Sequence, residues 1–193
     1  GGYLAARLAS AGHEVLCFAR GNHLEALQSR GLILQSDLGD AAVEGVTVTE
    51  RGAGHAPVDA VIVTVKIPDN ESAVAEIMPL LRKDTAVITF QNGIESPELL
   101  ERLIGGNRVV GGAAFISAVI DAPGVIRHGG TLARFAFGEL AGGLSARVNA
   151  VNDALVGAGL DCQASDSIMR VLWAKFVFIS AASGTNAAFR SSM

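Results

Sequence analysis

The feature that most constrains the fold is the nine-residue segment 59–67, DAVIVTVKI, which is apolar at nearly every position. A strand with one solvent-facing side would alternate apolar and polar residues, and this one does not. The pattern therefore predicts a central strand of a parallel sheet, with helices covering both faces. Residues 85–90 and 109–114 have the same apolar character and predict two more buried strands.

Segments with helical spacing alternate with these strands along the chain. Such alternation is typical of βαβ units, so we expect an α/β fold with a doubly wound, mostly parallel, Rossmann-like sheet. A closing hairpin is predicted at 125–127 and 134–137, with turns at Pro123 to Gly124 and at Gly129 to Gly130. The remaining expected strands are 14–19, 32–35 and 46–49, and the expected helices are 3–10, 23–30, 68–81, 96–103 and 145–156.

The character of the chain changes after Gly159. A long apolar helical pattern runs from Ile168 toward Phe189, with Ser165 or Asp166 as its cap. We therefore expect two domains: residues 1–163 form the α/β domain, and residues 164–193 begin a helical second domain.

Composition and charge exclude several classes of protein. The chain is 50% hydrophobic and 18% charged, which excludes intrinsic disorder. Its net charge of −4 and scattered basic residues argue against a nucleic-acid partner. Cys17 and Cys162 fit no metal-ligand spacing, and Lys175 interrupts the most apolar run. With no basic leader segment visible, we expect a cytoplasmic protein without metal or membrane.

Polar side chains follow the predicted strands where the carboxyl ends of a parallel sheet form a ligand crevice. Arg20, Lys66 and Asn92 hold these positions. Arginine stands where an acidic residue would bind the ribose of NAD, and its charge suits the 2′-phosphate of NADP, or it can be a solvated surface residue. Lys66 can meet a cofactor phosphate, or can simply emerge into solvent. Asn92 can orient a nicotinamide or a substrate carbonyl, or can be an ordinary turn residue.

Two further features point to the same chemistry. Gly1 and Gly2 open directly into a helix, as the last glycine of a dinucleotide-binding turn does, although a simple turn explains them equally well. Lys175 lies in an apolar helix between Trp173 and Phe176, where burial would lower its pKa toward that of a general acid. The alternative is a lysine that extends to solvent along its apolar stem.

Together these stretches resemble the ketopantoate reductase (2-dehydropantoate 2-reductase) family. The resemblance rests on GGYLAARLASAGHEV, FARGNHLEAL, VTVK, QNG, APGVIRHGG, FGE and LWAKFVFISAASG. It implies NADPH-dependent reduction of a 2-oxo acid to a 2-hydroxy acid, most directly of 2-dehydropantoate to pantoate. Lys175 would be the general acid and Asn92 its orienting partner. Arg20, Lys66 and Ser117 would lie along the cofactor with Gly1 and Gly2.

The resemblance also implies departures and alternatives. Family members carry substrate-binding asparagines where this chain has Ile179 and Ser183. Ser183 can replace one hydrogen bond, and Asn186 lies near the same helical face. Members also begin earlier, with a first strand, and continue past Met193 as a helical domain that forms a homodimer. We therefore expect this chain alone to be catalytically incompetent. Reduction of another oxo or imine acid, and a non-catalytic dinucleotide sensor, remain alternatives.

Overall fold

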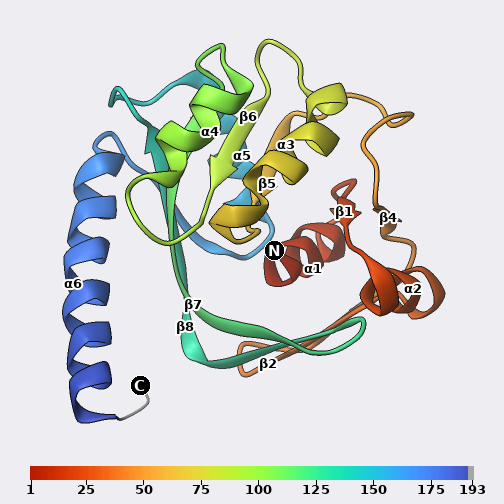
Figure 1. Ribbon diagram of the computed structural model, residues 1–193. Helices are drawn as coiled ribbons and strands as arrows, with labels where there is room; N and C mark the ends of the chain where they lie inside the picture. The colour runs from red at the N-terminus through yellow and green to blue at the C-terminus, as the bar shows by residue number, and fades with distance from the viewer. Residues whose placement is uncertain (191–193) are drawn as a thin grey trace.

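A mixed β-sheet between two helical layers forms the body of the protein (Figure 1). The computed structural model describes residues 1–190. The helices are α1 (Gly2–Ser10), α2 (Gly21–Arg30), α3 (Asn70–Ile77), α4 (Ser96–Ile104), α5 (Ala146–Gly157) and α6 (Ile168–Phe189), with the 3-10 turns η1 (Ile67–Asp69) and η2 (Met78–Leu80). The strands are β1 (Leu16–Phe18), β2 (Leu32–Ser36), β3 (Ala41–Val43), β4 (Thr47–Thr49), β5 (Ala60–Val63), β6 (Ala86–Thr89), β7 (Val109–Ala122), β8 (Val125–Glu139) and β9 (Asp161–Ala164).

The larger sheet has the strand order β3-β2-β8-β7-β6-β5, and β9 pairs with β8. Neighbours are parallel except for β2 with β3 and β7 with β8. The Rossmann-like α/β fold expected from the sequence is therefore confirmed. Strand β1 pairs in parallel only with β4, in a separate two-stranded sheet.

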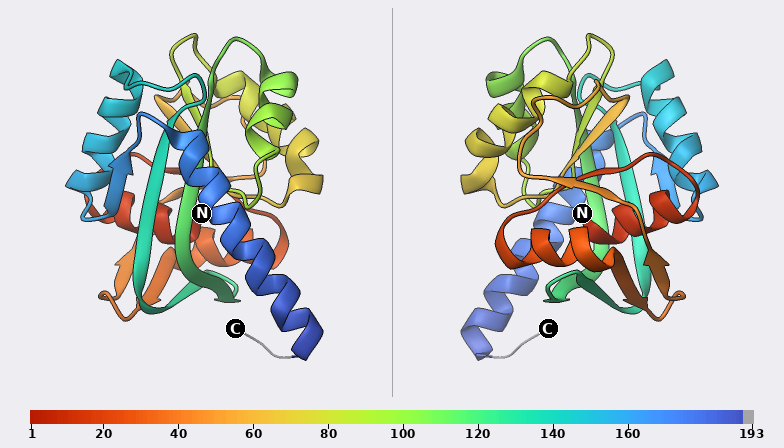
Figure 2. Two further views of the ribbon diagram at one scale, coloured as in Figure 1. Left: turned by 90° about the vertical axis from the view of Figure 1, so that its left-hand side faces the viewer. Right: turned by 90° about the vertical axis from the view of Figure 1, so that its right-hand side faces the viewer.

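Strand β6 shows why these segments lack an apolar and polar alternation. Ala86 and Ile88 pack into the core formed with α1 and α5, whereas Val87 packs against α3 and α4 on the other face. All four residues of β6 are buried, as a strand covered on both sides must be. Figure 2 shows α5 on one side of the sheet and α3 with α4 on the other.

The hairpin of β7 and β8 is longer than predicted. The predicted turn at Gly129 and Gly130 is wrong, because both residues lie inside the continuous strand β8. Only the turn at Pro123 and Gly124 joins the two strands. A register shift lies between Ile116 and Ala118, and beyond it the far end of β8 pairs with β2 of the same sheet.

Other local predictions are also corrected. Strand β5 pairs only with β6, so it ends the larger sheet instead of lying at its centre. Ser96 is not a helix cap: it is the first residue of α4, and its hydroxyl donates to Oε1 of Gln91 in the preceding turn. The cap of α6 is Ser167, not Ser165 or Asp166. Strands β3 and β9, of three and four residues, were not predicted.

Helix α6 lies along β7 and β8 and continues past them (Figures 1 and 2). Only Ile168, Leu172 and Lys175 of this helix are buried, and Phe178 and Phe189 are among its exposed aromatic residues. In the part of the chain that is described, α6 is the one helix long and apolar enough to cross a membrane by length and composition. Length and composition alone are a weak indication, since packed helices meet the same criteria.

Candidate functional site

Lys175 and Asn92 meet across the fold, although 83 positions separate them in the chain. The Lys175 ammonium Nζ donates hydrogen bonds to Asn92 Oδ1 at 2.9 Å and to the backbone oxygen of Ala114 at 2.7 Å. Asn92 follows β6, Ala114 belongs to β7, and Lys175 projects from α6. An ammonium carries three donors, so one remains for a further partner.

The buried stripe of α6 explains why this lysine faces inward. Ile168, Leu172 and Lys175 recur at helical spacing and are the buried residues of the helix. Lys175 is only 9% exposed, and burial lowers the pKa of its ammonium from the ordinary 10.5. This is the direction expected from the sequence for a lysine in an apolar helix. The ring of Phe115, whose centroid lies 5.4 Å from Nζ, also favours a cation at this point.

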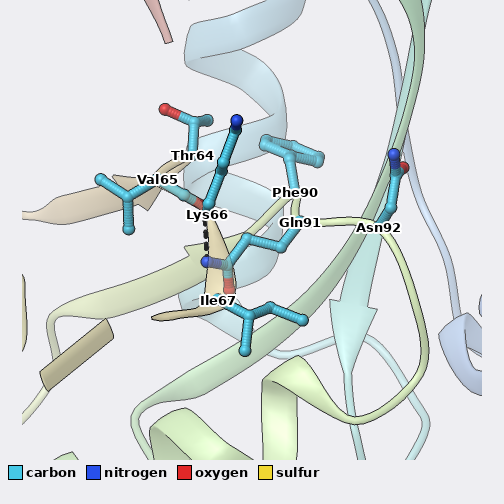
Figure 3. A pocket seen from close by; sticks show the side chains of 7 residues that line it. All are labelled: Thr64, Val65, Lys66, Ile67, Phe90, Gln91 and Asn92. Atoms are coloured by element: carbon cyan, nitrogen blue, oxygen red, sulfur yellow. Dashed lines mark hydrogen bonds between the residues drawn. The ribbon is translucent and has the colours of Figure 1, made fainter. Parts of the chain in front are cut away.

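A cavity of about 380 Å³ opens beside Asn92 at the carboxyl ends of β5 and β6. Its lining residues are Thr64, Val65, Lys66, Ile67, Phe90, Gln91 and Asn92 (Figure 3). The side chains of Lys66 and Asn92 extend the same way from their backbones (Figure 3). The structure therefore brings two of the predicted site residues to one cavity, in the crevice expected of a doubly wound sheet.

The first two glycines allow close approach of α1 to this cavity. A Cβ on Gly1 would lie 2.6 Å from Oγ1 of Thr64, a cavity-lining residue. A Cβ on Gly2 would lie 2.5 Å from Cγ1 of Ile126 in β8. Larger residues at either position would displace the start of α1. A helix that begins beside the cavity directs its free backbone N–H groups toward an anion there.

Arg20 and Ser117 are exposed and lie outside the lining of this cavity. Arg20 follows β1 and precedes α2, and within residues 1–190 its guanidinium makes no hydrogen bond or ion pair. Ser117, expected along the cofactor, lies within β7 at the register shift. Both side chains are therefore available to solvent or to a ligand.

Ser183 and Asn186 lie farther along α6 than the cluster around Lys175. At the rise of an α-helix they stand about 12 and 16 Å from Lys175 along the axis. Asn186 is partly buried on nearly the same face as Lys175, whereas Ser183 is exposed. The structure does not bring either residue into contact with Asn92 or Lys175.

Three participants in the site were not predicted. Gln91 entered the sequence analysis only as part of the stretch QNG, yet it is 7% exposed and lines the cavity. A polar residue directly after a fully buried strand was the available signal. The Ala114 oxygen and the Phe115 ring depend on the curvature of β7, which has no comparable signal in the sequence.

Other reactive groups do not form a competing centre. Burial raises the pKa of the Cys17 thiol to about 11 and that of Cys162 to about 12, so neither is a thiolate nucleophile at neutral pH. Across residues 1–190 no cluster of three or more His, Cys, Asp or Glu side chains is placed to hold a metal ion. The chemistry available is a cation beside a carboxamide, suited to donating a proton to a carbonyl oxygen.

Comparison with known families and sequences points to one group of enzymes. Residues 1–142 match the family model described as "Ketopantoate reductase PanE/ApbA". A 2-dehydropantoate 2-reductase of Mesorhizobium japonicum is 35% identical, over 91% of this chain and 60% of its own length. An uncharacterized oxidoreductase of Bacillus subtilis is 28% identical, over 98% of this chain and 62% of its own length. The chain thus spans about three-fifths of these relatives.

Solved structures agree with the sequence matches. The 2-dehydropantoate 2-reductase of Porphyromonas gingivalis superposes with a TM-score of 0.91 at 28% identity, over 98% of this chain and 69% of that one. A D-mandelate dehydrogenase, solved with NADH and anilino(oxo)acetate, superposes with a TM-score of 0.76 at 23% identity, over 86% and 53% of the two chains. The second likeness shows the fold alone.

Proposed function

Because the chain belongs to the ketopantoate reductase PanE/ApbA family, we propose that it takes part in the NADPH-dependent reduction of a 2-oxo acid to a 2-hydroxy acid. The first candidate substrate is 2-dehydropantoate, which would give pantoate. The observation that carries the proposal is the hydrogen bond of 2.9 Å between Lys175 and Asn92, at the edge of the cavity.

The proposed role of Lys175 is that of general acid. NADPH, when bound, supplies the hydride that adds to the ketone carbon. Lys175 gives one ammonium proton to the ketone oxygen, and the product is the hydroxy acid. The lysine is left as a neutral amine, which its buried position favours, and it regains a proton from water. Asn92 holds Nζ through Oδ1, so its own amide N–H groups are free to face the ligand.

The cofactor would bind where the chain fits a dinucleotide. Gly1 and Gly2 allow α1 to begin against Thr64, so its first N–H groups would meet the pyrophosphate. Lys66 would lie along the cofactor, Arg20 would meet the 2′-phosphate, and Ser117 would lie at the cofactor edge.

Arg20 gives a direct test of the choice between NADPH and NADH. We expect Arg20→Ala to weaken binding of NADPH and to leave binding of NADH nearly unchanged, since only NADPH carries the 2′-phosphate. The exposed cation Lys83 provides a control, because Lys83→Ala removes the same charge elsewhere. Equal losses for both nucleotides, or equal affinities in the unchanged protein, would contradict the role of Arg20.

The substrate is tested with a panel of 2-oxo acids on the full-length protein, followed by oxidation of NADPH. Ser183 and Asn186 would contact the substrate from α6, while Ile179 supplies no hydrogen bond. We expect 2-dehydropantoate to be the best substrate. A different preferred oxo or imine acid would replace it. Binding of NADPH without turnover of any acid would favour a dinucleotide sensor instead.

The remaining parts of the proposal concern organisation. We propose that residues 1–163 form the cofactor-binding domain and that residues 164–193 belong to a helical substrate and dimerisation domain. The protein would act as a cytoplasmic homodimer without nucleic-acid or membrane partners. Sedimentation of the full-length protein tests the dimer, and a monomer at assay concentrations would contradict it.

A further inference from the structure

Gln91 connects β6, α3, α4 and the loop after β5 through one buried side chain. Its Nε2 donates to the backbone oxygen of Val65 at 2.6 Å and to Asn70 Oδ1 at 2.7 Å. Its Oε1 accepts from the hydroxyl of Thr89 at 3.2 Å and from the hydroxyl of Ser96. A carboxamide offers two donors and two acceptor lone pairs, so all four are used.

Of these four partners, Val65 lines the cavity, as Gln91 itself does. Thr89 ends β6, Asn70 begins α3, Ser96 begins α4, and Val65 directly precedes Lys66. Gln91 itself directly precedes Asn92. Figure 3 shows the Gln91 side chain turning away from the direction taken by Lys66 and Asn92, with its hydrogen bond to the Val65 backbone drawn. The amide thus ties together the two backbone segments that carry the cavity's cation and carboxamide.

The cluster also contains a buried polar atom that is not paired within residues 1–190. Asn70 is 4% exposed, and its Nδ2 has no hydrogen-bond partner among the described residues. A buried unpaired donor costs about 1–3 kcal/mol. The chain accepts this cost while Asn70 Oδ1 is committed to Gln91. Gly93, with φ of +100°, then turns the backbone sharply after Asn92.

We propose that Gln91 is a positioning residue, which fixes the Lys66 segment and the Asn92 turn relative to each other through its saturated amide. The proposal rests on the function proposed above for the roles of Lys66 and Asn92. In this proposal Gln91 contacts neither the ketone of the substrate nor the ammonium of Lys175. It acts by holding Asn92 where Asn92 Oδ1 accepts a hydrogen bond from Lys175.

The test compares Gln91→Leu with Thr85→Val in the full-length protein. Thr85 is a matched control, because it is fully buried at the other end of β6 and its hydroxyl also bonds to backbone groups. Backbone hydrogen exchange is measured in segments 64–67 and 91–93, together with the stability to urea. We expect Gln91→Leu to speed exchange in both segments. Thr85→Val should lower the free energy of unfolding. Exchange in the two segments should then rise no more than this loss of global stability explains.

Kinetics supply the second readout. We expect Gln91→Leu to lower kcat by about 10- to 100-fold, the scale on which a small misplacement of a catalytic group acts. Asn92→Ala should cost less in the Gln91→Leu background than alone, because Asn92 is no longer held in place. Additive effects of the two substitutions would overturn the positioning role, as would unchanged exchange in both segments.

Two outcomes separate this inference from the proposed function. If Gln91→Leu does not fold, the test uses Ser96→Ala, which removes only one of the four hydrogen bonds of the Gln91 amide. Ser96→Ala should speed hydrogen exchange in segment 91–93, by less than the loss of all four bonds would. Unchanged exchange in that segment would refute the proposal. If the unchanged protein reduces no 2-oxo acid, the proposed function fails. Hydrogen exchange then still decides whether Gln91 couples the two segments.

Discussion

Replacement of Lys175 by methionine separates catalysis from stability most sharply. Methionine keeps an unbranched apolar stem of similar length and removes the ammonium that reaches Asn92 and Ala114. We expect the reductase rate to fall at least about a hundredfold, the usual scale for loss of a positioned acid, which is about 2.7 kcal/mol in the barrier. NADPH should still bind, because Lys175 does not line the cavity.

The same substitution should change the free energy of unfolding far less. The oxygen of Ala114 loses a donor, and an unpaired buried acceptor costs about 1–3 kcal/mol. In return, a buried cation is replaced by an apolar group of similar volume, which is often neutral or stabilising by about 1–4 kcal/mol. These terms oppose each other. We therefore expect a change in Tm of a few degrees, in either direction.

The assay follows NADPH oxidation by the full-length protein and Tm in parallel. Lys83→Met is the matched control, since Lys83 is exposed and makes no ion pair within residues 1–190. A Lys175→Ala variant leaves room for a small primary amine, which should restore part of the rate. An unchanged rate in Lys175→Met would refute the role of Lys175 as the acid, and so would an equal loss in Lys83→Met.

Three further predictions concern pH and packing. Burial lowers the pKa of Lys175 in the folded protein below 10.5, so between that lowered pKa and 10.5 the unfolded chain binds more protons than the folded one. The free energy of unfolding, relative to that of Lys175→Met, should therefore rise as pH increases toward 10.5. A difference between the two proteins that does not change with pH in urea titrations would contradict this. Glu139 accepts from Arg147 at 2.6 Å, which lowers the pKa of its carboxyl below 4.5. Its contribution to stability is therefore present at neutral pH and lost as pH falls through that lowered value, so Glu139→Gln should lower Tm at neutral pH by roughly 2–8 °C and much less in acid. Gly2→Ala should destabilise the fold by about 1–3 kcal/mol in calorimetry, because its Cβ meets the buried Ile126, whereas Gly184→Ala, in an open stretch of α6, should stabilise it slightly.

Fold class could be predicted because it depends on local pattern. The apolar runs that became β5, β6 and the start of β7 have helices between them, and only a layered α/β arrangement buries such runs on both faces. Sheet position could not be predicted in the same way. β5 is as apolar as a central strand, yet it pairs with β6 alone, because strand order depends on long-range pairing that single segments do not encode.

In the candidate site too, some residues could be predicted from local pattern and others could not. Lys175 and Asn92 could be singled out because each is a polar residue placed against an apolar local pattern, and the structure joins them by a hydrogen bond. Gln91 shows the opposite case, because its importance lies in four partners from separate elements. A turn residue with ordinary local chemistry gives no sign of such contacts until the chain is folded.

Lys175 and Gln91 also illustrate how several helices contribute to one site. Lys175 reaches the cavity edge from α6, while Gln91 ties the cavity floor to α3 and α4. Both meet at the turn after β6, where Asn92 accepts from the lysine and its preceding residue anchors the backbone. A substitution that loosens this turn should therefore disturb the proton donor without touching it. For this reason the coupling between Gln91 and Asn92, more than either single loss, tests how the fold holds its acid in place.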